Sequence, residues 1–200
     1  MGARVLEIDS LQVKDRTGLL KAQSYLKTKE CSLCHYATDL RKEFLFPVAS
    51  NGTGKLLVVG TQAFIEEHKN TIACSGPFRT IFNNYLSKYT GLLETDCTFT
   101  YAVKCTSTDK NNIIKAKVAE YKACSRYILQ EIKQIDPIII LFLGKDSAKS
   151  LIDNKTRNSV PMGTPFTSRI LGKKRWCYFM TNPIVTKTTT AAVPMVEAHF

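Results

Sequence analysis

Residues 138–143 carry an apolar side chain at every position, and Gly144 follows them directly. A run of this length predicts one β-strand, and its lack of alternation is typical of a strand covered on both faces of a parallel sheet. Further strands are predicted at 55–60, 97–103 and 175–180. Helical patterns separate these strands, so we expect an α/β fold, specifically a three-layer α/β/α sandwich with a mostly parallel central sheet.

The helical segments show apolar residues at the 3.6-residue spacing of one buried face. Gly76-Pro77 predicts a helix start, because proline is favoured in the first turn. A longer helix is expected to be capped by Asp109 or Asn111 and to end at Asp136-Pro137. Its predicted apolar positions are Ile114, Val118, Tyr121, Ile128, Ile132 and Ile135, and Cys124 falls on the same face.

The length of 200 residues predicts a single domain, with the segments 1–18 and 186–200 less clearly defined. Short helices are expected at 19–29 and 147–153. No apolar run approaches the ~20 residues of a membrane helix, and the N-terminus lacks a secretory pattern. We therefore expect no membrane association and an intracellular location in the cytoplasm or nucleoid, or in the host cell cytoplasm if the protein is viral.

The charge balance is strongly basic, with 28 Lys and Arg against 17 Asp and Glu and a formal net charge of +11. This excess predicts a polyanionic partner, most often nucleic acid, and the alternative is an ordinary basic surface. Trp176 and Phe166 flank a basic cluster and could stack on bases, unless this segment is a solvated hairpin with Trp176 in the core. The cluster consists of Arg169, Lys173, Lys174 and Arg175.

The seven cysteines are too few for a disulfide scaffold of this size and better fit a metal site with additional core thiols. Cys31 and Cys34 form a close pair ahead of the first core strand, Cys105 follows the second strand, and Cys124 falls on the long helix. Four thiolates from three elements can hold a [4Fe–4S] cluster or a zinc ion. The remaining alternative is that these cysteines bind no metal.

These cysteine contexts resemble those of the iron–sulfur, family 4-like class of uracil-DNA glycosylases. Three further segments match the family: 56–60, Ser75-Gly76-Pro77 and 137–144. The resemblance implies a [4Fe–4S] cluster on the four cysteines, a glycosylase-type fold over residues 20–185, and DNA as the ligand. It also implies that backbone amides at Gly60, Ser75 and Gly76 approach phosphates, and that the basic cluster lies near a loop that inserts into DNA in relatives.

The family's catalytic positions are largely replaced in this chain. After Gly60, Thr61 and Gln62 stand where relatives have an acidic or polar residue and a small residue, and the following proline is also absent. Cys74 stands where an aromatic residue stacks on uracil, and Tyr101 where an asparagine reads the base edge. Asn182 replaces the histidine that stabilises the leaving uracil anion.

The resemblance therefore implies a DNA-binding iron–sulfur protein with little or no uracil excision, acting as an accessory subunit in DNA replication or repair. Viral relatives serve as polymerase processivity components, so a DNA polymerase or another replication protein is an expected partner. The alternative is an active glycosylase for uracil or another damaged base, with a pocket rebuilt from Thr61, Gln62, Tyr101 and Asn182. A redox-sensing switch is a third reading. His68 and His199 fall outside the motifs; we expect His68 to be a solvated helix or loop residue and His199 to be a tail residue.

Overall fold

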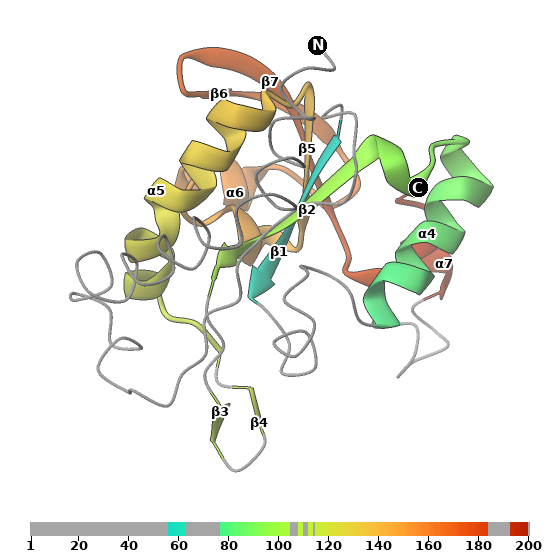
Figure 1. The fold of residues 1–200 in the computed structure, drawn as a ribbon, viewed down its shortest axis with the longest axis horizontal. Coiled ribbons are helices and arrows are strands. Elements are labelled where there is room, and N and C mark those ends of the chain that lie inside the picture. The colour runs from blue at the N-terminus through green and yellow to red at the C-terminus, as the bar shows by residue number, and fades with distance from the viewer. Residues whose placement is uncertain are drawn as a thin grey trace, which may run out of the picture.

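The fold is built on a five-stranded sheet with the order β2-β1-β5-β7-β6 (Figure 1). A computed structural model describes residues 56–62, 77–104, 108–109, 112–113, 115–183 and 193–199. The first four strands in that order are parallel, and β6 is antiparallel to β7. The strands are β1 (Leu56–Gln62), β2 (Cys97–Val103), β5 (Ile139–Leu143), β6 (Pro165–Ile170) and β7 (Lys173–Met180). The predicted α/β class with a mostly parallel sheet is confirmed.

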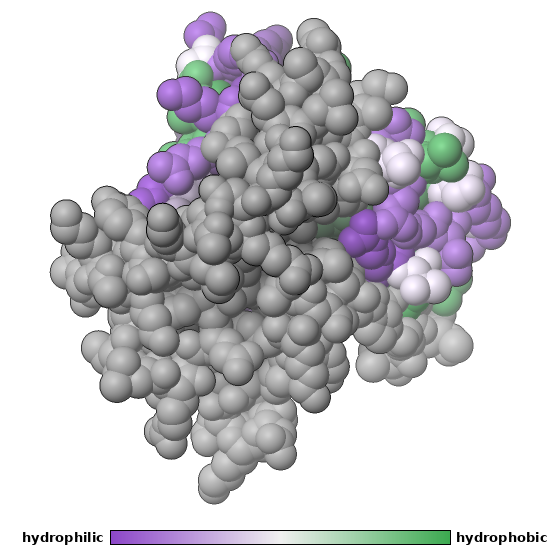
Figure 2. Space-filling model, viewed as in Figure 1, coloured by the Kyte–Doolittle hydropathy of each residue, from purple (hydrophilic) through white to green (hydrophobic). Residues whose placement is uncertain are grey.

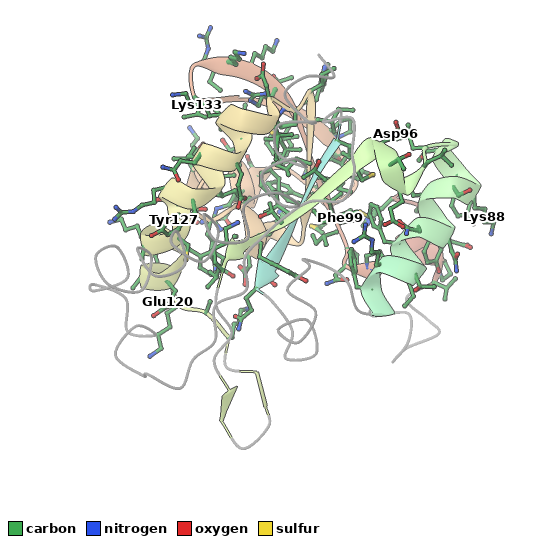
Figure 3. All side chains as sticks on the ribbon, viewed as in Figure 1. Lys88, Asp96, Phe99, Glu120, Tyr127 and Lys133 are labelled. Atoms are coloured by element: carbon green, nitrogen blue, oxygen red, sulfur yellow. The ribbon has the colours of Figure 1, made fainter. Side chains whose placement is uncertain are left out.

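Two helices cover opposite faces of this sheet, α5 (Val118–Ile135) on one and α4 (Pro77–Thr90) on the other (Figure 1). The side chains of β1 alternate between the two faces of the sheet. Leu57 and Val59 belong to a buried cluster with α5 residues. Leu56 and Val58 belong to a second buried cluster with α4 residues. Phe99 of β2 lies on the α4 side, where its ring meets those of Phe78 and Phe82 (Figure 3). The three-layer prediction is therefore confirmed.

The predicted start of the long helix is wrong. Asp109 belongs to a small antiparallel ladder of β3 (Thr108–Asp109) and β4 (Asn112–Ile113), and α5 begins only at Val118. The side chain of Glu120 caps the helix by accepting a hydrogen bond from the Lys117 backbone N–H at 2.7 Å. Asp and Asn favour tight turns as much as helix caps, which explains the error. Val118 is 67% exposed rather than buried.

The predicted helix end is confirmed. Asp136 has left-handed backbone angles, with φ 51° and ψ 52°, and its N–H donates to the Ile132 carbonyl at 2.9 Å. The apolar face of α5 is buried at Tyr121, Cys124, Ile128, Ile132 and Ile135, as expected.

The segment after β5 differs from the prediction. A short 3-10 helix, η3 (Lys145–Ala148), follows the strand, and α6 (Asn154–Ser159) comes later. Asp153, predicted to end a helix, instead caps α6 by accepting the Thr156 N–H at 2.9 Å. The strand itself is covered on both faces only from Ile140 onward, since Ile138 and Ile139 are 56% and 40% exposed.

The C-terminal region also contains order that its composition did not reveal. Helix α7 (Val193–Glu197) packs through the fully buried Val196, and the Tyr89 hydroxyl of α4 donates to the Glu197 carboxylate at 2.7 Å. The outward surface of α4 is hydrophilic (Figure 2). None of the helices in the described part of the chain combines the length and apolarity needed to cross a membrane. The predicted helix at 19–29 lies outside the described residues.

A buried arginine ties the α5–β5 turn to β7. Arg175 donates to the Pro137 carbonyl and, at 2.7 Å, to the Asp136 carboxylate. Lys173 reaches the second carboxylate oxygen of Asp136, also at 2.7 Å. The hydrogen bonds from Lys173 and Arg175 lower the pKa of Asp136 from 3.8 to about 2.

This carboxylate should contribute to the acid sensitivity of the fold. Because its folded pKa lies below the unfolded value, its stabilising effect is present above pH 3.8 and is lost as the pH falls toward about 2. Asp136→Asn should lower stability at pH 7 and flatten the loss of stability over that acidic range. Asparagine keeps the left-handed backbone accessible. Urea unfolding at a series of pH values measures this.

A matched pair of lysine variants provides the control. Lys173→Met should reproduce part of the Asp136→Asn effect, whereas Lys174→Met on the opposite face should not. Equal pH profiles for both lysine variants would argue against the assigned ion pair.

Candidate functional site

The parallel strands end at one edge of the sheet, the carboxyl edge, which is the lower edge in Figure 1. Thr61 and Gln62 end β1, Lys104 follows β2, Gly144 follows β5, and Asn182 lies two residues past β7. Loops at this edge hold the ligands of open α/β sheets. The topology therefore brings Thr61, Gln62 and Asn182, which were predicted as site positions, to the same edge as the ends of β2 and β5.

Gly60 and Tyr101 are in direct contact across the β1–β2 pair. A Cβ at Gly60 would lie 2.6 Å from the Tyr101 ring, so only glycine fits beside this side chain. Tyr101 is 3% exposed and packs in the cluster on the α4 side. The tyrosine therefore occupies the space above Gly60 instead of lining an open cavity there.

Gln62 is 8% exposed, and its side-chain oxygen accepts the Ala116 backbone N–H at 2.8 Å. This bond joins the end of β1 to the segment that leads into α5. An amide has no basic group, so Gln62 can position a partner through hydrogen bonds but cannot remove a proton.

Asp146 of η3 adds a carboxylate to this edge that sequence reasoning did not identify. It pairs with Lys115 at 2.8 Å and with Lys149 at 2.9 Å. Desolvation, the largest single influence, raises its pKa, but the hydrogen bonds from the two lysines leave the pKa below its ordinary value. Lys115 precedes Ala116, so Gln62 and Asp146 bind adjacent residues. The sequence offered one signal for this residue, because Asp146 follows the predicted strand 138–143 and Gly144.

His199, expected to be a tail residue without a role in the site, also lies at the carboxyl edge. Its Nδ1 accepts the Thr181 N–H at 3.1 Å, and its carbonyl accepts the Tyr178 hydroxyl at 2.9 Å. The ring packs against Gly163. Burial lowers the pKa of His199, which favours the neutral imidazole. Because Nδ1 accepts a hydrogen bond, the proton of the neutral ring is on Nε2. The ring contacts Thr181, the residue before Asn182. His68 lies outside the described residues.

A buried ion pair fixes the end of β2. The Lys104 ammonium lies 2.8 Å from the Glu131 carboxylate of α5 and 2.6 Å from the Thr100 hydroxyl. Desolvation raises the pKa of Glu131, although Lys104 and Thr100 oppose the shift. This network anchors the residue directly before Cys105.

Of the four predicted metal ligands, only Cys124 lies among the described residues. It is 5% exposed and shares a buried cluster with Ala102 and Val103 at the end of β2. The α5 face that carries Cys124 thus lies against the strand that leads into Cys105. Across the described residues, no three His, Cys, Asp or Glu side chains form a group that could hold a metal. Cys31, Cys34 and Cys105 fall outside that part.

The predicted DNA-binding residues are not brought to the carboxyl edge. Arg169, Lys173, Lys174 and Arg175 lie around the β6–β7 turn, at the opposite edge of the sheet (Figure 1). Lys173 and Arg175 form ion pairs with Asp136. Arg169 and Lys174 are exposed. Cys74, Ser75 and Gly76 lie outside the described residues, directly before α4. Trp176 is 54% exposed, which excludes the alternative that it belongs to the core.

The contact between Gly60 and Tyr101 can be tested by coupled substitutions. Gly60→Ala should destabilise the protein by about 1–3 kcal/mol through overpacking, although alanine normally stabilises a strand. Combining it with Tyr101→Val should cost less than the sum of the two single variants, because the smaller side chain accommodates the new methyl group. Urea unfolding measures the three free energies.

Tyr101→Phe serves as the control, because it keeps the ring atoms that the methyl group would meet. It should give no such relief. Additive effects in the valine cycle would mean that the close approach is absent.

The comparisons with known proteins agree with this architecture. A model of the uracil DNA glycosylase superfamily matches residues 47–194, which include the whole central sheet. No individual curated protein matches the chain. With a mostly parallel sheet, helices on both faces and a carboxyl edge formed by the ends of β1, β2, β5 and β7, the chain belongs to the uracil DNA glycosylase superfamily.

Proposed function

We propose that the protein is a DNA-binding member of this superfamily with little or no uracil excision, serving as an accessory subunit in DNA replication or repair. DNA is the expected ligand of a glycosylase-like fold, and the net charge of +11 favours binding to a polyanion. A DNA polymerase or another replication protein is the proposed partner.

The proposal rests on one observation: side chains at the carboxyl edge make contacts within the protein that stabilise the fold. The Gln62 side-chain oxygen is bonded to the Ala116 N–H, and the Tyr101 ring fills the space over Gly60. Base excision requires room for a flipped nucleotide and polar groups that face it. Side chains that hold the fold together at these positions favour DNA binding over base excision.

We also propose that Cys31, Cys34, Cys105 and Cys124 bind a [4Fe–4S] cluster, with zinc as the alternative. Support comes from Cys124, which shares a buried cluster with Val103, two residues before Cys105 in the sequence. The Lys104–Glu131 ion pair would hold that strand end in place. Such a cluster would connect the N-terminal cysteine pair to the core and contribute to folding.

A second candidate is an active glycosylase with a rebuilt pocket based on Thr61, Gln62, Tyr101 and Asn182. Two groups at the carboxyl edge favour it: the Asp146 carboxylate and the neutral His199 imidazole next to Thr181. A carboxylate can orient water, and an imidazole N–H can donate to a leaving anion. Neither role requires the motifs that this chain lacks.

Base release distinguishes the two candidates. Anaerobically purified, iron-loaded protein should release no uracil above background from single- or double-stranded oligonucleotides, while still binding the same oligonucleotides without uracil. Loss of a single catalytic donor or acid costs about 10²- to 10⁴-fold in rate, so several losses together should abolish turnover. Chromatography of the free base measures release, and fluorescence anisotropy measures binding.

Turnover that disappears in Asn182→Ala, Asp146→Asn or His199→Gln would instead establish the active glycosylase. Lys133→Met, an exposed change at the far end of α5, should leave any such turnover unchanged (Figure 3). Absence of both turnover and DNA binding would contradict both candidates.

Two buried cysteines of the same hydrophobic core provide a test of the proposed [4Fe–4S] cluster and its control. Cys124 and Cys177 are 5% and 1% exposed and belong to the same hydrophobic core on the α5 side of the sheet. Cys124→Ser should lower bound iron and acid-labile sulfide well below the roughly four of each per chain that a [4Fe–4S] site holds, whereas Cys177→Ser should retain both. Elemental analysis and visible absorption report the result. Bound zinc without visible absorption would support the zinc alternative.

A further inference from the structure

The β6–β7 hairpin separates the basic cluster into two groups with different surroundings. Lys173 and Arg175 point to one side of β7, where both pair with Asp136. Lys174 and Trp176 occupy the alternate positions and therefore point to the other side. Register pairing places Arg169 opposite Lys174, and Thr167 and Ile139 opposite Trp176. These residues share one face of the sheet, which we call the Trp176 face.

The Trp176 face is open along its whole length. Trp176 is 54% exposed and Ile139 is 40% exposed. The β6 and β7 residues beside them, Pro165, Thr167, Arg169 and Lys174, are exposed as well. Figure 2 shows mostly hydrophilic residues with some apolar ones at the β6–β7 turn, where Leu171 is 47% exposed. On this side of the sheet, the buried cluster that contains the α4 residues extends to Leu141 and Leu143 of β5 and to Met180 of β7, but it includes none of the residues of the Trp176 face.

The two cations of the Trp176 face are available to a ligand. Neither Arg169 nor Lys174 forms an ion pair with another residue in the part of the chain that the structure describes. Each lies one side-chain step, roughly 7 Å along the strand, from the position level with the indole. An exposed aromatic plane beside two cations that pair with no described residue matches a ligand that has both flat rings and negative charges.

We propose that the Trp176 face binds single-stranded nucleic acid, with a base stacked on the Trp176 indole and phosphates paired with Lys174 and Arg169. Unpaired strands offer base faces to a flat sheet, as in other sheet-based binders, whereas a duplex keeps its bases stacked inside. An acidic peptide would satisfy the cations but leave the indole without a stacking partner. The combination therefore favours a single strand.

This surface is separate from the carboxyl edge. Trp176 is level with Ile139, the first residue of β5, while Asn182 lies six residues further along the chain. At ~3.3 Å per residue, the two positions are roughly 20 Å apart. A strand bound to the Trp176 face would contact the protein whether or not base release takes place at the other edge, so this inference does not rest on the proposed function.

The chain contains a single tryptophan, which makes the test direct. Titration of the intact protein with a 12-residue oligodeoxythymidine should quench tryptophan emission in a saturable way. The same sequence annealed to its complement should quench less at equal concentration. Equal or stronger quenching by the duplex, or no quenching by the single strand, would overturn the proposal.

Anisotropy of a labelled oligodeoxythymidine tests the individual residues. Trp176→Ala should weaken binding by about 5- to 150-fold, the range measured for loss of one stacked base, and Trp176→Phe should weaken it less. Lys174→Met and Arg169→Met should each reduce the slope of log affinity against log salt by about 0.7. Lys133→Met removes the same charge from α5 and should leave the affinity of this surface within twofold.

Three outcomes would count against the Trp176 face. One is that the substitutions on this face leave oligonucleotide affinity unchanged. Another is that an acidic peptide quenches tryptophan emission as strongly as the oligonucleotide does, which would assign the surface to a protein partner. The third is that Lys133→Met weakens binding as much as Lys174→Met. If Trp176→Ala fails to fold, Trp176→Phe and the wild-type quenching decide the question.

Discussion

Strands β1 and β5 lie inside the sheet, hydrogen-bonded to neighbours on both sides, and residues 56–59 and 140–143 are covered on both faces. These stretches have no polar face, so each of their residues enters one of two apolar clusters. That requirement fixes α5 on one face and α4 on the other. It also directs β1, β2, β5 and β7 the same way, so that their ends form the carboxyl edge.

Local pattern predicted the core of this arrangement. The strand over 97–103 was predicted with its observed bounds, because its apolar and β-branched residues stand between clear breaks. The end of α5 was predicted because proline excludes a helical residue before it. The start of α5 was missed because Asp109 suits a turn as well as a cap, and Ile114 falls by coincidence on the helical period.

The site was only partly predictable, because its contacts join distant residues. Gln62 was identified as a site position, but its partner Ala116 lies 54 residues away. His199 was set aside because nothing in a short tail sequence indicates that its ring meets Thr181. The basic cluster was recognised as a group, yet strand alternation and Asp136 determine which of its cations form ion pairs with described residues. Sequence supplied the chemical groups, and the fold determined which of them meet.

Among the described strands, β6 ends the sheet on one side, and an edge strand is where a second chain can add by backbone pairing. Its first residue, Pro165, lacks an amide hydrogen, and Arg169 places a charge near its other end. Both features oppose the growth of a sheet between molecules. The hairpin that exposes an aromatic plane therefore also carries protection against self-association, which allows an apolar side chain to remain accessible without causing aggregation.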